Sequence, residues 1–202
     1  MKTILHLSCS PRGEAAESYR LSRGITDFLL REPGTELVER MIGAGLSPID
    51  ADYAVSQSSS ADVSRAGTMA RSEELIRELE SADYVVIGTP MHNLTVPAAL
   101  KAWLDHVVRA RRTFHMTAAG KTGALRDRPV FIAISSGGRF SGERARQPDF
   151  LTPYLKEVLG TIGLRDLRFF SVQGTGAGEE AVAQARVQAE RELRKHFAAP
   201  GA

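Results

Sequence analysis

The chain has 202 residues, of which 43% are hydrophobic and 25% charged, and its formal net charge is +2 at pH 7. This length suits one well-buried domain, and we interpret residues 1–202 as a single domain. The nearly balanced charge argues against nucleic-acid binding. Because no apolar run reaches the roughly 18 to 20 residues that a membrane helix needs, we expect no insertion into a membrane.

The first nine residues resemble a secretion signal or a lipoprotein start only superficially. Their apolar part is short and His6 interrupts it, so we interpret residues 3–8 as a first strand. Cys9 is the one cysteine of the chain and can form no intrachain disulfide, which is typical of a reducing cytoplasm. We therefore expect a cytoplasmic protein in which Cys9 is a small buried residue.

Apolar runs and segments with helical periodicity alternate along the rest of the chain. This alternation indicates right-handed βαβ units and an α/β fold with a parallel sheet covered by helices on both faces. For five strands, the flavodoxin-like order 2-1-3-4-5 is expected. The predicted strands are residues 3–8, 35–41, 83–89, 129–135 and 166–172, and the predicted helices are residues 16–31, 63–80, 96–110, 150–162 and 179–197.

Two long segments are predicted to be irregular. Residues 43–62 are polar and rich in serine, and we interpret them as a surface loop. Residues 110–128 carry several arginines together with Phe114 and His115, and loops of this length are often functional. We interpret this second segment as a lid or as part of a partner subunit's active-site wall, which makes Phe114 and His115 candidate substrate contacts.

The loop after the first strand has the features of a phosphate site. In the expected strand order, the first and third strands flank the switch point where ligands bind. The loop offers hydroxyl groups and the free amides of a helix start, which attract an anion. We predict a monophosphate site with Ser10 and Ser18 as side-chain donors and the amides around Ala16 and Glu17 as backbone donors. An ordinary turn with Ser18 as a helix cap is the alternative.

The third strand ends in a polar elbow that faces the same crevice. This elbow offers backbone amides, a carboxamide and an imidazole but no acid, nucleophile or metal cage, so we predict a cofactor site without a metal. The segment after the fourth strand leaves the same sheet edge and is expected to form a third wall. The elbow comprises Pro90, Met91, His92, Asn93 and Leu94, and the third wall comprises Ser136, Gly137 and Gly138.

Other phosphate-binding patterns fit less well. No G-x-G-x-x-G follows the first strand, which argues against a dinucleotide site of the Rossmann type. Gly120-Lys121-Thr122 resembles the end of a P-loop, but His115 stands where the leading glycine is needed. The glycine-rich residues 174–178 after the fifth strand are interpreted as a chain break before the last helix.

Four motifs occur in a fixed order along the chain, and together they resemble the FMN-dependent NADH azoreductases, which belong with the flavodoxin-like quinone reductases. The resemblance implies an FMN-dependent oxidoreductase that takes a hydride from NADH or NADPH and passes it to a quinone or azo acceptor by a ping-pong mechanism. It also implies a homodimer with active sites at the subunit interface. The motifs are residues 10–18, residues 90–93 with Leu100-Lys101, Thr113-Phe114, and residues 136–138 with residues 151–155.

The resemblance also implies roles for individual residues. The FMN phosphate would lie on Ser10 and Ser18, and Phe114 would serve the flavin of its own or the neighbouring subunit. The elbow Met91-His92-Asn93-Leu94 would line the flavin ring, and residues 136–138 would hold its other edge. Where the family usually has Met-Tyr-Asn-Phe at the elbow, this chain has an imidazole and an aliphatic group, which leaves open whether quinones or azo dyes are preferred.

Two elbow residues are candidates for the chemistry itself. We predict that Asn93 orients the ring and that its amide, with those of Gly137 and Gly138, stabilises the charge of reduced flavin. His92 is a candidate proton donor to the substrate. The alternatives are an NAD(P)H-dependent FMN reductase, an electron carrier of the flavodoxin type and a signalling domain. A carrier is disfavoured by the slightly basic charge, and a receiver-type signalling domain by the absence of acidic residues at the ends of the first and third strands.

Overall fold

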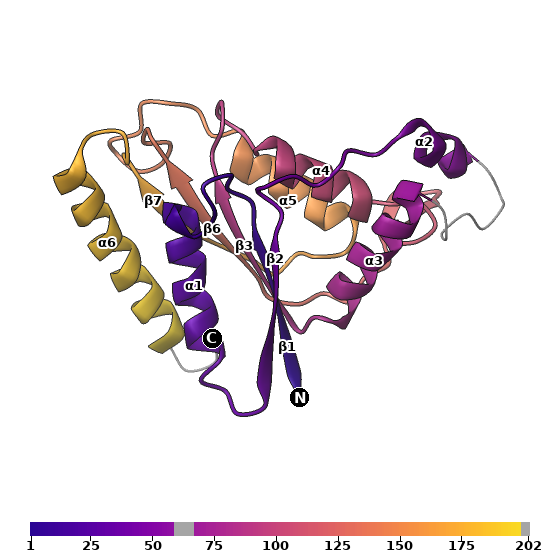
Figure 1. The fold of residues 1–202 in the computed structure, drawn as a ribbon, viewed down its shortest axis with the longest axis horizontal. Coiled ribbons are helices and arrows are strands. Elements are labelled where there is room, and N and C mark those ends of the chain that lie inside the picture. The colour runs from indigo at the N-terminus through magenta and orange to yellow at the C-terminus, as the bar shows by residue number, and fades with distance from the viewer. Residues whose placement is uncertain (59–66, 199–202) are drawn as a thin grey trace.

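The computed structural model describes residues 1–58 and 67–198. Its centre is a five-stranded parallel sheet with the order β2-β1-β3-β6-β7 (Figure 1). These are the five strands predicted from the sequence, so the flavodoxin-like order is confirmed once the two strands outside the sheet are left out of the count. The strands of the sheet are β1 (Lys2–Ser8), β2 (Thr35–Met41), β3 (Tyr84–Pro90), β6 (Val130–Ser136) and β7 (Leu167–Gln173).

Helices cover both faces of the sheet (Figure 1). One face packs against α1 and α6, and the other against α3, α4 and α5. Among the described residues, no helix has the length and apolar character needed to cross a membrane. The helices are α1 (Glu17–Leu29), α2 (Ala51–Ser58), α3 (Gly67–Ser81), α4 (Ala98–Val107), α5 (Leu151–Thr161) and α6 (Glu179–Ala198), with one turn of 3₁₀ helix at Gly13–Ala15.

The alternation of side chains along each strand divides the hydrophobic core into two parts. In β1, Ile4 joins the core beneath α1 and α6, whereas Leu5 and Leu7 join the core beneath α3, α4 and α5. The same division occurs in β3, because successive residues of a strand point to opposite faces. Both cores share one sheet, which supports the interpretation of residues 1–202 as one domain; that interpretation stays a prediction.

The structure differs from the sequence-based expectation in two segments. Residues 43–62 were expected to be a loop, but α2 (Ala51–Ser58) lies within them, while residues 59–62 are outside the described part, as are residues 63–66 of the predicted second helix. Residues 110–128 contain an antiparallel hairpin of β4 (Phe114–Thr117) and β5 (Gly120–Gly123). These elements have only four to eight residues, too few for their periodicity to stand out from that of a loop.

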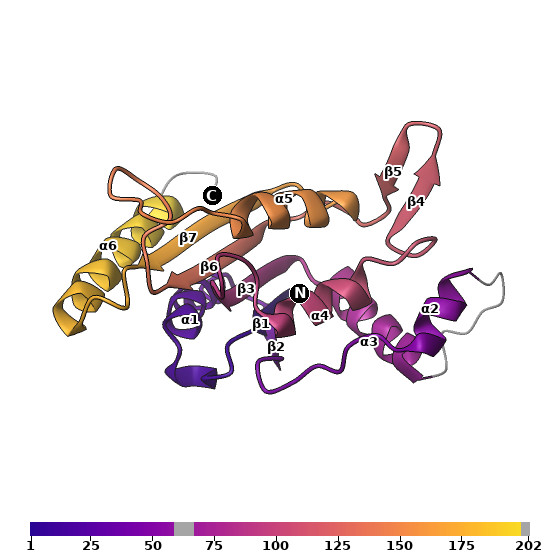
Figure 2. The same ribbon diagram turned by 90° about the horizontal axis from the view of Figure 1, so that it is seen from above.

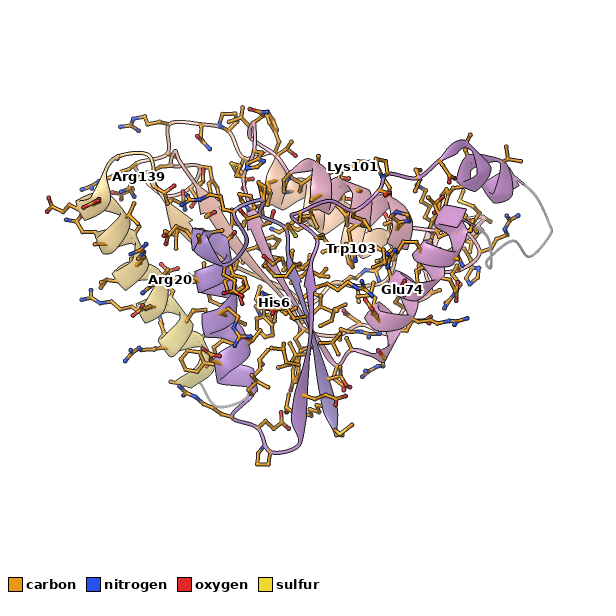
Figure 3. All side chains as sticks on the ribbon, in the orientation of Figure 1. His6, Arg20, Glu74, Lys101, Trp103 and Arg139 are labelled. Atoms are coloured by element: carbon orange, nitrogen blue, oxygen red, sulfur yellow. The ribbon has the colours of Figure 1, made fainter. Side chains whose placement is uncertain are left out.

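A buried histidine connects strand β1 to helix α1 and to the edge strand β2. The His6 side chain is fully buried, and its Nε2 lies 2.7 Å from Ser22 Oγ and its Nδ1 2.8 Å from Glu39 Oε1. It points from the sheet toward α1 (Figure 3). Burial lowers the pKa of His6 below its ordinary value, outweighing the opposite effect of the hydrogen bond to Glu39.

The lowered pKa of His6 predicts a loss of stability at mildly acidic pH. A histidine that is neutral in the folded state takes up its proton in the unfolded state first, so protonation below about pH 6.5 favours unfolding. The free energy of unfolding should be insensitive to His6 above this pH and should fall by up to about 1.4 kcal/mol per pH unit below it. Urea unfolding between pH 8 and 5.5 measures this slope.

The matched variant for this measurement is His6→Gln, which keeps hydrogen-bonding capacity without a titrating ring. It should be less stable at pH 8 but show a shallower loss between pH 6.5 and 5.5, where His196, whose pKa is also lowered by burial, still titrates. Equal slopes in the two proteins would contradict the prediction.

Candidate functional site

A cleft of about 730 Å³ lies at the edge of the sheet where the parallel strands end. Four segments line it, each following a strand of the central sheet, as expected for ligand sites in open α/β folds. The sequence predicted the first three of these walls. The lining residues are Ser10, Pro11, Arg12, Ala16 and Glu17 after β1; Pro90, Met91 and His92 at the end of β3; Ser135 and Gly137 at the end of β6; and Thr175, Gly178, Glu179, Val182 and Arg186 after β7.

The first wall ends at a helix start that lacks a side-chain cap. Ala16 is the N-cap residue of α1 and makes no side-chain hydrogen bond to the helix. The first amides of a helix have no intrahelical acceptor and carry a partial positive charge. Ser18, in the first turn, is fully buried, and its Oγ has no hydrogen-bond partner. Both features suit an anion that would accept hydrogen bonds from this helix start.

A neighbouring glycine fixes the position of the Ser10 loop. The Gly43 amide donates to Ser8 O at 3.1 Å, and a Cβ atom on Gly43 would lie 1.9 Å from Ser10 O. No side chain fits such a gap, so the backbone after β2 and the loop after β1 touch directly. The Ser10 Oγ in turn accepts a hydrogen bond from the Arg12 amide at 3.2 Å.

The second wall is a tight turn in an unusual backbone conformation. His92 and Thr95 exchange two backbone hydrogen bonds of 2.9 and 3.0 Å around Asn93 and Leu94, which have φ angles of 47° and 71°. Two successive positive φ angles are typical of a type I′ turn, which normally takes Asn or Gly. A leucine there is strained, and such strain concentrates at functional sites. Within the described residues, the amides of Asn93 and Leu94 donate no hydrogen bond.

The third wall is supported from behind by side chains that do not line the cleft. Gln147 Nε2 lies 3.1 Å from Met91 Sδ and 3.2 Å from Ser136 Oγ. Gly137 and Gly138 accept backbone hydrogen bonds through their carbonyl groups, whereas their amides donate to no group of the described chain. Ser136 thus holds Met91 in place, and the two glycines offer free donors.

The fourth wall was not predicted as part of the site. Residues 174–178 were interpreted as a chain break, yet Thr175 and Gly178 line the cleft together with the start of α6. The amides of Thr175 and Gly176 donate to the carbonyl groups of residues 136 and 137 at 3.1 Å, which joins the third and fourth walls. The signal was present in the sequence, because this loop leaves the same edge of the parallel sheet as the other three.

The structure brings together some of the predicted site residues and not others. Seven of the predicted cofactor-binding residues line the cleft, namely Ser10, Ala16, Glu17, Pro90, Met91, His92 and Gly137. Five others are next to these but outside the lining, namely Ser18, Asn93, Leu94, Ser136 and Gly138. Pro11, Arg12 and Ser135 belong to the loops that were expected to face this crevice, although no role was assigned to them, whereas sequence reasoning missed the five lining residues after β7.

The predicted substrate residues Phe114 and His115 are not at the cleft. They begin the β4–β5 hairpin, which projects from the body of the molecule at the end opposite α6 (Figure 2). Phe114 is buried in the core beneath α3, α4 and α5, while His115 is exposed. Neither residue lines the cleft of its own chain, and the expectation that the segment contributes to a partner subunit's site stays a prediction.

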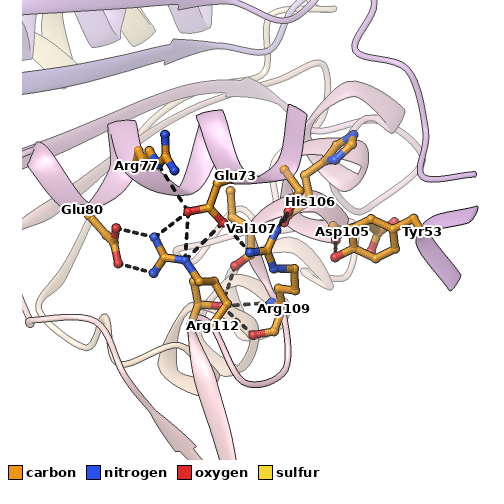
Figure 4. Close-up of polar contacts among 11 residues, drawn as sticks. Tyr53, Glu73, Arg77, Glu80, Asp105, His106, Val107, Arg109 and Arg112 are labelled. Atoms are coloured by element: carbon orange, nitrogen blue, oxygen red, sulfur yellow. Dashed lines mark hydrogen bonds and ion pairs between the residues drawn. The ribbon is translucent and has the colours of Figure 1, made fainter. Parts of the chain in front are cut away.

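A charged cluster fixes the base of this hairpin on α3 (Figure 4). Arg109 is buried and donates to Ser72 Oγ at 3.0 Å and to Glu73. Arg112 donates to Glu73 Oε1 at 3.1 Å and to Glu80 Oε2 at 2.6 Å. Arg109 and Arg112 are thus paired with carboxylates of α3.

The cleft contains few titrating groups. Among residues 1–58 and 67–198, no three His, Cys, Asp or Glu side chains are grouped closely enough to hold a metal ion. Cys9 is buried, and burial raises the pKa of its thiol. The groups that the chain itself presents to a ligand are hydroxyls, backbone amides, the His92 imidazole, the guanidinium groups of Arg12 and Arg186 and the carboxylates of Glu17 and Glu179.

The fold and the cleft together define a flavodoxin-like protein with an uncapped helix start beside a polar turn. A family model of proteins with a flavodoxin-like fold matches residues 2–197. The chain is 49% identical over 184 residues to FMN-dependent NADH:quinone oxidoreductase 4 of Pseudomonas fluorescens, which covers 90% of this chain and 89% of that protein. It is 44% identical to FMN-dependent NADH:quinone oxidoreductase 5 of Burkholderia lata, with 93% of each chain covered.

Solved structures agree with the fold. An azoreductase from Bacillus anthracis has a TM-score of 0.79 at 22% identity, covering 96% of this chain and all of that one. An FMN-dependent NADH-azoreductase from the same species, in complex with FMN, has a TM-score of 0.78 at 20% identity, covering 98% of this chain and all of that one. The chain belongs to the flavodoxin-like family that includes the FMN-dependent NADH:quinone oxidoreductases, which confirms the resemblance noted in the sequence.

The close contact at Gly43 predicts a large effect of a small substitution. Gly43→Ala should lower the free energy of unfolding by about 2 kcal/mol, because its methyl group displaces the backbone of Ser10. Urea unfolding measures the loss. The control is Gly160→Ala in α5, where a Cβ atom meets nothing within 4 Å and the substitution should be neutral or stabilising by up to about 1 kcal/mol. Similar effects for both variants would contradict the steric argument.

Proposed function

We propose that this protein is an FMN-dependent NADH:quinone oxidoreductase that binds FMN in the cleft. The observation that carries the proposal is the grouping of free hydrogen-bond donors at one cleft: an uncapped helix start and the unbonded Gly137 amide in its walls, and the unbonded amides of Asn93, Leu94 and Gly138 directly beside them. The helix start can hold a phosphate, and the unbonded amides can hold the polar edge of a flavin ring. The names of relatives up to 49% identical over most of the chain support the same function.

The first wall suits the phosphate of FMN. The Ala16 amide donates to Gly13 O at 3.1 Å, whereas the Glu17 amide begins a helix without a side-chain cap, and the buried Ser18 Oγ has no partner among the described residues. An unpaired buried hydroxyl costs free energy that a bound anion would recover. Ser10 lines the cleft on the other side of the loop. We assign the phosphate to Ser10, Ser18 and the amides of this helix start.

The second and third walls suit the flavin ring. The amides of Asn93, Leu94, Gly137 and Gly138 are donors without an acceptor in the described chain. Held in a rigid turn, such donors need no reorganisation when charge develops beside them, which is how a protein stabilises an anionic form. Met91 is fixed by Gln147 beneath them. We assign Asn93 and the two glycines to the polar edge of the ring and Met91 and Leu94 to its faces.

When bound, FMN supplies two-electron transfer from a nicotinamide to an acceptor. The protein binds and orients the reactants and supplies protons. His92 is exposed and lines the cleft, so its ring can exchange protons with solvent and can reach a substrate in the cleft. We assign His92 the role of proton donor to the reduced acceptor. NADH or NADPH is the reductant, and a quinone or an azo compound is the acceptor.

In a homodimer, the β4–β5 hairpin of one subunit would contribute to the site of the other subunit. Phe114 and His115 begin a projecting hairpin that is distant from the cleft of their own chain, and the neighbouring Met116 is 69% exposed. A hairpin that projects away from its own cleft is free to reach the cleft of a second copy of the chain. We assign Phe114 and His115 to the site of the partner subunit. The cytoplasmic location expected from the single cysteine belongs to the same proposal.

Visible spectra under anaerobic conditions test the proposed function. The protein loaded with FMN should lose its flavin absorbance on addition of NADH and regain it on addition of a quinone. Buffer with free FMN at the same concentration is the control. Binding without loss of absorbance would contradict the role of NADH as reductant, and failure to bind FMN would contradict the cofactor site itself.

A charge placed in the phosphate loop should release the cofactor. Ser18→Asp should weaken FMN binding by about 100-fold or more, because a buried carboxylate beside a phosphate costs several kcal/mol. Titration of the apoprotein with FMN, followed by flavin fluorescence, measures the dissociation constant. The control is Ser18→Asn, because asparagine has the same size as aspartate but no charge. This variant should bind FMN much more tightly than Ser18→Asp. Full FMN occupancy in Ser18→Asp would show that the phosphate lies elsewhere.

A further inference from the structure

An ion pair between two helices forms part of the cleft wall at its phosphate end. Arg186 of α6 donates to Glu17 of α1 through Nε at 2.8 Å from Oε2 and through Nη2 to Oε1. Both residues line the cleft, and their side chains are 37% and 16% exposed. Glu17 is the first residue of α1, directly after the uncapped Ala16. The two charges thus stand beside the proposed phosphate position.

The carboxylate of Glu17 poses an electrostatic problem at this position. Its pKa is lowered, chiefly by the hydrogen bond from Arg186 and also by the charges of Arg186, Arg20 and Arg12, so it is ionised at neutral pH. A carboxylate beside a phosphate repels it, and the repulsion is strong where solvent is partly excluded. Arg186 is the group that neutralises this charge, and its guanidinium can bond to a carboxylate and a phosphate together because it has five N–H donors.

A purely structural role for the pair is disfavoured by the rest of the helix interface. The α1 and α6 helices already pack through Leu21, Ile25 and Leu193, which are buried in one core with the sheet. A second ion pair, Arg20 with Glu190, joins the same helices at 3.6 Å, is more exposed and does not line the cleft. The two pairs differ in their relation to the cleft, so Glu190→Gln is a control for the loss of an ion pair between these helices that does not change the cleft wall.

We infer that Arg186 is a positioning residue for the phosphate monoester of the cofactor and that Glu17 is its counter-charge, so that the pair sets the affinity for the phosphorylated flavin. The inference rests on the proposed function, because it requires FMN in the cleft. According to this inference, the wall of the cleft that follows β7 takes part directly in cofactor binding.

The test compares FMN with riboflavin, which has the same ring but no phosphate. Dissociation constants are measured by flavin fluorescence for the apoprotein of the wild type, Arg186→Gln, Glu17→Gln, the double variant and the control Glu190→Gln. Arg186→Gln should weaken FMN binding by about tenfold or more, as expected for loss of a charge-assisted hydrogen bond, and should leave riboflavin binding unchanged. Glu17→Gln should tighten FMN binding, and the double variant should recover most of the loss.

The opposite signs of the two single variants distinguish the inference from a structural role. If both weaken FMN and riboflavin alike, or if Glu190→Gln has the same effect as Arg186→Gln, the pair only ties α6 to α1 and the inference is wrong. FMN binding by Arg186→Gln at the wild-type level also overturns it while leaving the proposed function intact. Wild-type protein that binds no FMN overturns both. Thermal unfolding of each apoprotein, followed by circular dichroism, verifies that the variants are folded.

Discussion

The direction of the strands in the central sheet is the constraint on which the site depends. Because β1, β3, β6 and β7 are parallel, the four segments that follow them all begin at one edge of the sheet. Parallel strands require crossover helices, and these start at the same edge, so helix N-termini and loops meet there. A cleft rich in backbone donors follows from the topology, before any particular side chain is considered.

Within that cleft, the chain supplies donors by leaving backbone groups without acceptors. The turn at Asn93 and Leu94 accepts the strain of two positive φ angles, and its amides stay unbonded in the described chain. The amides of Gly137 and Gly138 also donate no hydrogen bond within the described chain, while their carbonyl groups accept hydrogen bonds from the loop after β7. Rigid, unsatisfied donors are unfavourable in an empty protein and favourable for a ligand with acceptors at its edge.

Few of the arginines of the chain line the cleft. Arg109 and Arg112, in or next to residues 110–128, form ion pairs with carboxylates of α3 and hold the base of the hairpin. The cations that line the cleft are Arg12 and Arg186, and Arg186 is itself paired with Glu17. The electrostatic attraction for a phosphate thus depends on a balance between a few groups and the helix start.

The sequence by itself determined the sheet, its strand order and three of the four walls of the cleft. Buried parallel strands are nearly continuous apolar runs, and the residues after Ser8, Pro90 and Ser136 follow directly from where these runs end. Short elements such as α2 and the β4–β5 hairpin were missed because their stability comes from packing on α3 and α5 more than from local periodicity.

Only the tertiary structure decided which distant side chains meet. It separated Phe114 and His115 from the cleft of their own chain, placed the backbone of Gly43 against Ser10 and brought Arg186 to Glu17 across 169 positions of sequence. Pairings of this kind depend on how α1 and α6 lie on one face of the sheet. The charge pattern of either helix alone does not contain that information, because α6 has several arginines that could pair with Glu17 and several glutamates that could pair with the arginines of α1.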